Sequence, residues 1–220
     1  MLNTYLELKN INKTYRSFAL KDIEISFKGG RWYYLDGENG AGKTTLLNII
    51  VNFIFPDSGE ILYFGKQLKG NENWIKNRMA FIPNYVGLPS HVTPRFLSKM
   101  YKDMYKRFDM KSFEKYIHEF NIDNMDQKLG QMSDGMKKKV LIALEMSYFP
   151  DIIIADEICN NLDEESIYYC FEQIDKLCKE NNTLVIISSH NNQEIMKKNP
   201  IVPKNGIIRE RGHHEFIYRR

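Results

Sequence analysis

Nine consecutive residues near the N-terminus match a loop that binds phosphate groups. Within the segment 37–45, the first eight residues satisfy the pattern G-x-x-x-x-G-K-[ST] in full. Glycines let successive backbone N–H groups turn inward toward phosphate oxygens, and the lysine adds positive charge for the β- and γ-phosphates. The first threonine hydroxyl is a hard oxygen ligand for Mg²⁺. The sequence therefore predicts a nucleotide site with Mg²⁺ as cofactor, made of Gly37, Glu38, Asn39, Gly40, Ala41, Gly42, Lys43, Thr44 and Thr45.

Two adjacent acidic residues follow an apolar segment later in the chain. Residues 152–155 read Ile-Ile-Ile-Ala, and Asp156 and Glu157 come directly after them. Such a run is typical of a parallel strand covered on both faces, and ligands bind at the carboxyl ends of these strands. Asp156 is therefore a candidate Mg²⁺ ligand, directly or through water. Glu157 faces differently, so it can polarise water for in-line attack on a γ-phosphate.

A short segment before that strand predicts a second anion-binding helix terminus. Residues 132–136 read Met-Ser-Asp-Gly-Met and precede a helical pattern. The N-terminus of a helix exposes backbone N–H groups that attract anions, and a serine hydroxyl adds a donor. Ser133, Gly135 and Met136 are therefore candidate anion-binding residues. The alternative is an ordinary N-cap serine with Asp134 in the first helical turn.

The elements that must position these residues follow an α/β pattern. Alternating apolar residues indicate β-structure in the first thirty residues, with a turn at 29–30. We expect strands at 31–35, 61–64, 151–155 and 184–187, a helix over 44–55, and a hairpin at 201–211. Strands separated by helices predict a parallel sheet.

The segment 87–150 has a different texture and predicts a mainly helical subdomain. Methionine and aromatic residues recur at helical spacing between 100 and 120. We interpret this stripe as core, and the alternative is a face that contacts a partner. We expect one domain over 1–220, with 1–86 and 151–220 forming the core around this insertion.

Composition and charge exclude several classes of protein. The chain has 220 residues, 43% hydrophobic, and a formal net charge of +3, which is typical of a globular protein. We expect no signal peptide and no membrane span, because no apolar stretch is long enough. Three cysteines without a C-x-x-C pair predict reduced thiols. The run 137–139 of three lysines is interpreted as a solvated face, so we expect no nucleic-acid partner.

Together these motifs resemble the nucleotide-binding domain of an ABC transporter. The resemblance rests on GENGAGKTT, IIIADE, Leu162-Asp163 and the segment 187–190, in that order over essentially the whole chain. Residues 132–136 resemble the signature sequence LSGGQ. The resemblance implies a P-loop NTPase core of RecA-like type, with an N-terminal antiparallel β part and an inserted α-helical subdomain.

The resemblance also implies roles for single residues. Tyr15 would stack on adenine, Asn84 would replace the Q-loop glutamine near Mg²⁺, and His190 would contact the γ-phosphate. Asp163 would meet a second ATPase subunit, in a homodimer or heterodimer. Ser133 and Gly135 would then bind the γ-phosphate of ATP held by that subunit.

Three positions depart from the family pattern. Asn84 is one methylene shorter than glutamine, so we expect slower hydrolysis or altered coupling with ATP binding retained. The signature has Asp134 and Met136 where glycine and glutamine are common, a form that resembles drug, antibiotic and lantibiotic exporters. Residues 158–159 are Ile-Cys instead of Pro-Thr.

The sequence predicts an ATP-hydrolysing subunit that energises a separately encoded membrane permease, an exporter, at the cytoplasmic face of the cell membrane. One alternative is a soluble ABC-type ATPase acting on nucleic acid or the ribosome. A second is a degenerate ATPase that binds ATP without hydrolysing it. A GTPase is disfavoured because the chain lacks an N-K-x-D motif.

Overall fold

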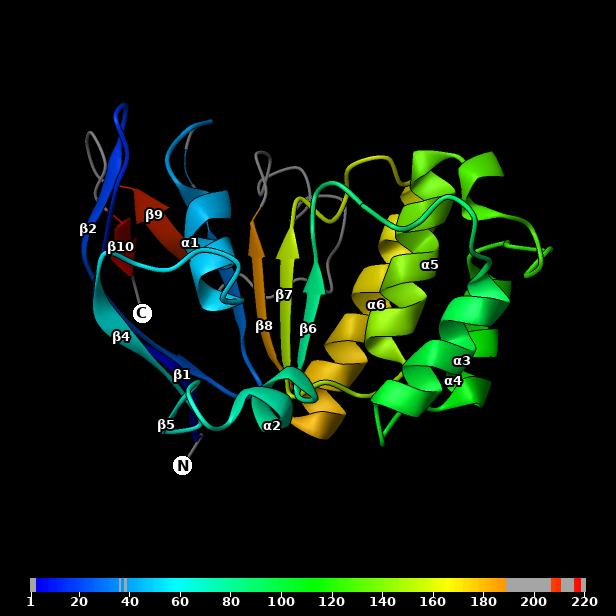
Figure 1. Cartoon of the computed structure of the whole chain (residues 1–220), viewed down its shortest axis with the longest axis horizontal. Helices are drawn as coiled ribbons and strands as arrows, with labels where there is room; N and C mark the ends of the chain where they lie inside the picture. Colours follow the sequence, from blue (N-terminus) through cyan, green and yellow to red (C-terminus); the bar gives the residue numbers. More distant parts are fainter. Residues whose placement is uncertain (1–2, 36, 38, 189–206, 211–215, 219–220) are drawn as a thin grey trace.

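The computed structural model describes residues 3–35, 37, 39–188, 207–210 and 216–218. Its strands lie mostly toward the two ends of the chain, and four helices follow one another between β6 and β7 (Figure 1). In order they are β1 (Thr4–Thr14), β2 (Ala19–Lys28), β3 (Trp32–Leu35), α1 (Lys43–Ile50), β4 (Ser58–Tyr63), β5 (Lys66–Gln67), α2 (Glu72–Lys76), β6 (Met79–Ile82), α3 (Pro94–Met104), α4 (Met110–Glu119), the 3₁₀ helix η1 (Leu129–Gln131), α5 (Asp134–Met146), β7 (Ile152–Asp156), α6 (Glu164–Asn181), β8 (Leu184–Ser188), β9 (Ile207–Glu210) and β10 (Phe216–Tyr218).

The strands form two sheets. The first is antiparallel, in the order β2-β1-β4-β5, and the second has the order β10-β9-β3-β8-β7-β6. All pairings in the second sheet are parallel except that of β9 with β10. Parallel neighbours need a crossover connection, and α6 supplies it between β7 and β8. This arrangement confirms the predicted α/β class with an antiparallel N-terminal part.

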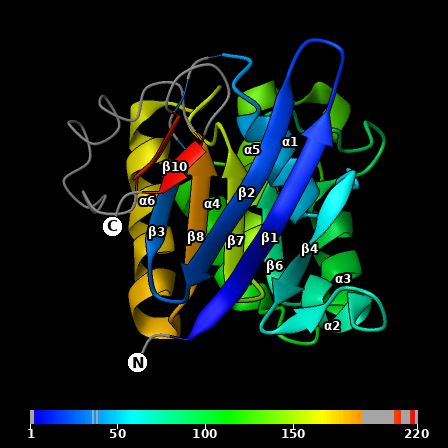
Figure 2. The same cartoon turned by 90° about the vertical axis from the view of Figure 1, so that its left-hand side faces the viewer.

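Helix α1 lies between the two sheets, and α6 covers the opposite face of the parallel sheet (Figures 1 and 2). Ile152 and Ile154 belong to the apolar cluster on the α1 side, whereas Ile153 and Ala155 belong to the cluster on the α6 side. Successive side chains of a strand point to opposite faces. Burial of both faces therefore explains the continuous apolar run that precedes Asp156.

Helices α3, α4 and α5 all lie within 94–146; α5 packs against β6 and α6, and α3 and α4 pack against α5 (Figure 1). Of the predicted apolar stripe, the aromatic residues Phe108, Phe113, Tyr116 and Phe120 are buried, which confirms that part as core. Met104 is instead 58% exposed. The division at residues 86 and 150 stays a prediction.

Some predicted boundaries were wrong. Helix α1 ends at Ile50 rather than at residue 55, because Asn52 adopts a left-handed backbone with φ of 62°. Strand β4 begins at Ser58 rather than at 61, since Ser58 pairs with Asn12 of β1. Residues 201–206 and 211 of the expected hairpin lie outside the described residues; β9 pairs with β10 and with β3. Within the described residues, no helix is both long and apolar enough to cross a membrane.

Candidate functional site: a phosphate-binding loop and its acidic partner

The phosphate-binding loop connects β3 to the first residue of α1. Gly42 caps this helix with φ of +92°, and a Cβ at this position would lie 2.8 Å from Leu20 Cδ2. Only glycine adopts this backbone without cost, and only glycine leaves room for the neighbouring side chain. Lys43 is 5% exposed, and its ammonium group donates to the Gly37 carbonyl oxygen. The lysine therefore bridges the two ends of the loop.

The remaining loop residues lie around this bridge. Asn39 and Gly40 are exposed, Ala41 is buried, and Thr45 is half-buried. Gly40 has φ of +85° with open space where a Cβ would project. Such a loop leaves its backbone accessible to a bound anion. The predicted residue Glu38 lies outside the described residues.

The loop meets the end of β7 through a direct side-chain contact. The Thr44 hydroxyl donates to Asp156 Oδ2 at 2.9 Å, and the Ser188 hydroxyl donates to Asp156 Oδ1. Asp156 is only 4% exposed, so both carboxylate oxygens are held in place. Hydroxyl and carboxylate oxygens form the hard donor set that Mg²⁺ prefers. The donor set of Thr44 and Asp156 therefore fits the predicted cation.

Ser188 was missed by sequence reasoning. It lies at the end of β8, and β8 pairs in parallel with β7 so that Asp156 and Ser188 are opposite each other. A polar residue closing an apolar strand was the signal available, because carboxyl ends of parallel strands share one edge.

Glu157 follows Asp156 in a left-handed backbone conformation, with φ of 49°. Its N–H donates to the Ser188 carbonyl oxygen at 3.1 Å. Its carboxylate accepts from the Asn160 side-chain amide, and the same amide donates to Asn84 Oδ1 at 3.1 Å. Asn160 was not predicted as a site residue, yet it joins Asn84 to Glu157.

The predicted signature residues begin helix α5. Ser133 is the N-cap, and its Oγ accepts from the Met136 N–H at 3.2 Å. This is the ordinary capping geometry that was the alternative interpretation, and it engages one of the N–H groups expected to face an anion. Asp134 is largely exposed and pairs with Lys137 at 3.0 Å. Its charge is thus directed toward a lysine of its own helix.

Gly135 brings α5 close to the loop after β7. A Cβ at Gly135 would lie 2.3 Å from the Asn161 carbonyl oxygen, far inside van der Waals contact. In the same loop, Asp163 caps α6 and forms an ion pair with Lys139 at 2.7 Å. The hydrogen bond from Lys139 holds the pKa of Asp163 well below its usual range.

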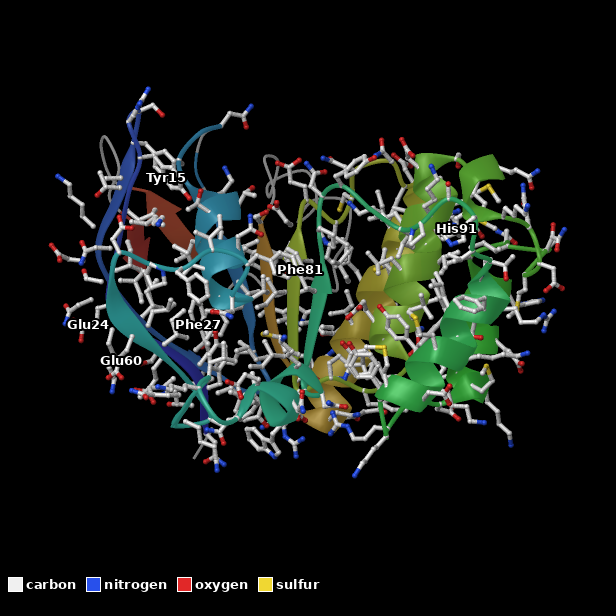
Figure 3. The ribbon with its side chains drawn as sticks, in the orientation of Figure 1. Tyr15, Glu24, Phe27, Glu60, Phe81 and His91 are labelled. Carbon is white, nitrogen blue, oxygen red and sulfur yellow. The ribbon has the colours of Figure 1, made fainter. Side chains whose placement is uncertain are left out.

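An aromatic pair lies beside the phosphate loop. Tyr15 follows β1, is 39% exposed, and stacks on Phe18 with ring centroids 5.1 Å apart. Phe18 in turn lies against Gly42, since a Cβ there would be 2.9 Å from Phe18 Cε2. Figure 3 shows Tyr15 at the end of the molecule where α1 begins. The structure thus adds Phe18 to the predicted aromatic platform.

Two further residues complete the comparison with the sequence. His190 lies outside the described residues. Cys159 is half-buried, and burial raises the pKa of its thiol to about 11, so the thiol stays protonated near neutral pH. In the described part of the chain, no group of three or more His, Cys, Asp or Glu side chains is arranged to hold a metal ion.

Comparisons with known proteins agree with this geometry. The family model described as ABC transporter matches residues 20–160. The chain is 30% identical to the bacitracin transport ATP-binding protein BcrA of Bacillus licheniformis, covering 95% of this chain and 68% of that protein. It is 29% identical to the spermidine/putrescine import ATP-binding protein PotA of Mesoplasma florum, covering 99% of this chain and 64% of that protein. The chain thus spans about two thirds of the length of these relatives.

The fold also matches a solved structure. A dimeric ATP-binding cassette in a post-hydrolysis state, bound to ADP and Pi, superposes with a TM-score of 0.77 at 22% identity. The match covers 92% of this chain and 93% of that chain. With the phosphate loop, the Thr44–Asp156 contact and the family match in place, this chain belongs to the ABC transporter family and is an ATP-binding cassette of its ATPase type.

Proposed function

We propose that this chain binds and hydrolyses ATP to power a membrane permease, working as one half of a head-to-tail pair of ATPase subunits. The contact of Thr44 with Asp156 carries this proposal, because it brings the phosphate loop to the strand end that presents Glu157. The distance of 2.9 Å links two motifs that lie 112 residues apart. Hydrolysis of a nucleotide at this edge of the sheet needs both the phosphate loop and the acidic residues that follow β7.

ATP binding rests on the loop, the lysine and the aromatic pair. Lys43 exchanges its bond to the Gly37 carbonyl for the β- and γ-phosphates, and N–H groups at the start of α1 face the same charge. The Tyr15 ring offers a flat face to adenine, and the Phe18 ring stacks on Tyr15. Stacking tolerates any base, so this platform alone does not select ATP over GTP.

Hydrolysis rests on the acidic pair. Thr44 and Asp156 would hold Mg²⁺, with the Asn84 amide as a further ligand, and the cation supplies positive charge beside the phosphates. Glu157 orients water for in-line attack, and Asn160 sets the direction of its carboxylate. His190 steadies the γ-phosphate, a role proposed from the sequence alone.

The pair forms when the start of α5 reaches the nucleotide on the other subunit. Ser133 and Gly135 would then contact that γ-phosphate, with Asp163 at the interface. Support comes from the exposed N-terminal end of α5 and from the dimeric form of the matched cassette. The Ser133 oxygen accepts from the Met136 N–H, so its own O–H proton can donate to phosphate while the cap is kept.

Opening and closing of the pair would drive the permease at the cytoplasmic face of the cell membrane. The relatives named for bacitracin transport and for spermidine/putrescine import are both ATP-binding proteins of transport systems. We propose export as the direction, on the Ser-Asp-Gly-Met-Lys form of the signature at 133–137.

Two measurements test this function. ATP hydrolysis by the purified chain should require Mg²⁺, and Glu157→Gln should keep ATP binding, reduce turnover to a small residual rate and accumulate a dimer seen by light scattering. A Glu157→Gln protein that turns over at the wild-type rate would overturn the catalytic assignment. Affinity capture from gently solubilised native membranes should recover a polytopic membrane protein. Recovery of ribosomes or nucleic acid instead would overturn the transport role.

A further inference from the structure

The three consecutive lysines of α5 are not a solvated basic face, contrary to the expectation from sequence. Lys137 pairs with Asp134 at 3.0 Å, and Lys139 pairs with Asp163 at 2.7 Å. Lys138 is 1% exposed, and its Nζ donates to the Glu157 carbonyl oxygen at 2.7 Å. The run therefore connects the signature helix to its own first turn and to two residues of the loop after β7.

The contact of Lys138 falls on the backbone of the residue proposed to orient water. Glu157 holds a left-handed conformation that a residue with a side chain adopts at some cost, so surrounding contacts must maintain it. Ser188 of β8 accepts from its N–H, and Lys138 of α5 donates to its carbonyl oxygen. The peptide groups on both sides of the Glu157 Cα are thus fixed from two different elements.

The burial of Lys138 indicates that its hydrogen bond to Glu157 is needed in the folded protein. A lysine is almost never fully buried without a partner, because its ammonium group loses hydration. Burial lowers the pKa of Lys138, and the charges of nearby groups, those of Asp156 and Glu157 included, act in the opposite direction. The Glu157 carbonyl oxygen is the hydrogen-bond partner that offsets the burial of this ammonium group.

We infer that Lys138 is a positioning residue for ATP hydrolysis, holding the backbone of Glu157 so that its carboxylate meets the attacking water. This inference rests on the proposed catalytic role of Glu157. The Lys138 contact also connects the start of α5 to Glu157 within one subunit, because Lys138 and the N-cap Ser133 belong to the same end of α5. Figure 1 shows the loop after β7 passing over this end of α5 before it enters α6. A shift of the signature helix therefore moves Glu157 in the same protomer.

Substitution of the full chain tests the inference. Lys138→Met keeps the linear stem and removes the donor, and Lys115→Met on α4 is the matched control because Lys115 is exposed. We expect Lys138→Met to bind a fluorescent ATP analogue within twofold of wild type. Its kcat should fall on the order of 10- to 100-fold, the effect of a misplaced catalytic group. Lys115→Met should match wild type in both. A Lys138→Met protein with kcat within twofold of wild type, or with affinity and kcat lost together, overturns the inference.

A double-variant cycle separates positioning from a general structural role. In a Glu157→Gln background the added Lys138→Met change should cost less than twofold in residual turnover, because both act through one group. An undiminished loss in that background overturns the inference. Wild-type turnover by Glu157→Gln alone would instead refute the proposed function of Glu157, so the two failures are distinguishable.

Amide hydrogen exchange supplies a readout that needs no turnover. Without nucleotide, Lys138→Met should exchange faster than wild type at residues 157–162 and equally at residues 152–155 of β7. Unchanged exchange at 157–162 overturns the inference. Should Lys138→Met not fold, Lys138→Gln, which keeps a shorter donor, is measured in the same way. Exchange at 157–162 faster than in wild type supports the inference, and unchanged exchange overturns it.

Discussion

The hydroxyl of Thr44 and the carboxylate of Asp156 lie 2.9 Å apart, although 112 residues separate them in the chain. Thr44 is in the first turn of α1, and Asp156 ends β7 at the edge where β8 contributes Ser188. Their contact fixes the relative position of the phosphate loop and the acidic pair. Two of the ligands proposed for Mg²⁺ are therefore placed before any cation arrives.

Replacing Asp156 tests this arrangement. Asp156→Asn keeps the size of the side chain and removes its charge. The Mg²⁺ affinity of the ATP complex should therefore fall by about 10- to 100-fold, the range of losses when residues of a metal site are changed. Nucleotide binding without Mg²⁺ should stay within twofold of wild type, since Lys43 and the loop are intact. Titration of Mg²⁺ against turnover and against nucleotide fluorescence measures both. An unchanged Mg²⁺ dependence would remove Asp156 from the metal site.

Gly135 makes a second contact that a single methyl group should disrupt. A Cβ there would lie 2.3 Å from the Asn161 carbonyl oxygen, and this is backbone that moves only with the whole loop. Gly135→Ala should lower the free energy of unfolding by about 1–3 kcal/mol, the usual cost of overpacking. Gly87→Ala is the matched control, because its Cβ would meet open space. Urea unfolding of both variants measures this difference. Equal midpoints for Gly135→Ala and Gly87→Ala would contradict the close approach of Gly135 to Asn161.

Sequence predicted the parts of the site that depend on local chemistry. The loop at 37–45 and the Asp156–Glu157 pair were found because phosphate binding demands particular residue types in contiguous order. Ser188, Phe18 and Asn160 were missed because their roles depend on which strand or loop lies beside them. The serine that ends the apolar strand β8 marks the edge of the sheet, but only the pairing of β8 with β7 shows that it contacts Asp156.

The three lysines of α5 show the same limit most clearly. Locally Lys137, Lys138 and Lys139 are equivalent, yet successive residues of a helix point about 100° apart. That rotation directs the first to its own helix turn, the second into the core and the third to Asp163. The end of α1 was also predicted at the wrong residue. A left-handed asparagine that stops a helix leaves only a weak signal in the sequence.

The bridge made by Asn160 gives a prediction about the short Q-loop residue. Asn160 uses its side-chain amide to contact both Asn84 Oδ1 and the Glu157 carboxylate. We expect Asn160→Ala and Asn84→Ala each to lower turnover with ATP affinity retained. The double variant should be less impaired than the product of the two effects, with a coupling energy of about 0.5–3 kcal/mol. If the loss of turnover in the double variant equals the product of the two single losses, Asn160 and Asn84 act separately. Asn84→Gln should also change turnover, because it lengthens one side of this bridge.

A buried carboxylate joins the helices to β6 and predicts a pH dependence of stability. Glu145 of α5 is 7% exposed and accepts from the Tyr101 hydroxyl at 2.7 Å and from the Phe81 N–H at 3.3 Å. Its Oε2 lies 2.6 Å from the Tyr148 hydroxyl oxygen. Tyr148 Oη also lies 3.1 Å from the Met79 carbonyl oxygen. One hydroxyl proton cannot serve both acceptors. A protonated Glu145 resolves this by donating to Tyr148, which then donates to Met79.

Burial raises the pKa of Glu145, in the same direction as this proton count. Because the folded pKa lies above the unfolded value of about 4.3, the stability contributed by Glu145 is complete below that pH. It is lost as the pH rises through the folded pKa, at up to about 1.4 kcal/mol per pH unit. Glu145→Gln cannot ionise, and its amide can donate to Tyr148 as the protonated acid does. The free energy of unfolding of Glu145→Gln minus that of wild type should therefore grow between pH 5 and the folded pKa and then level off. Urea unfolding of both proteins across this range measures the difference, and a difference that is constant with pH would show that Glu145 is charged in the folded protein.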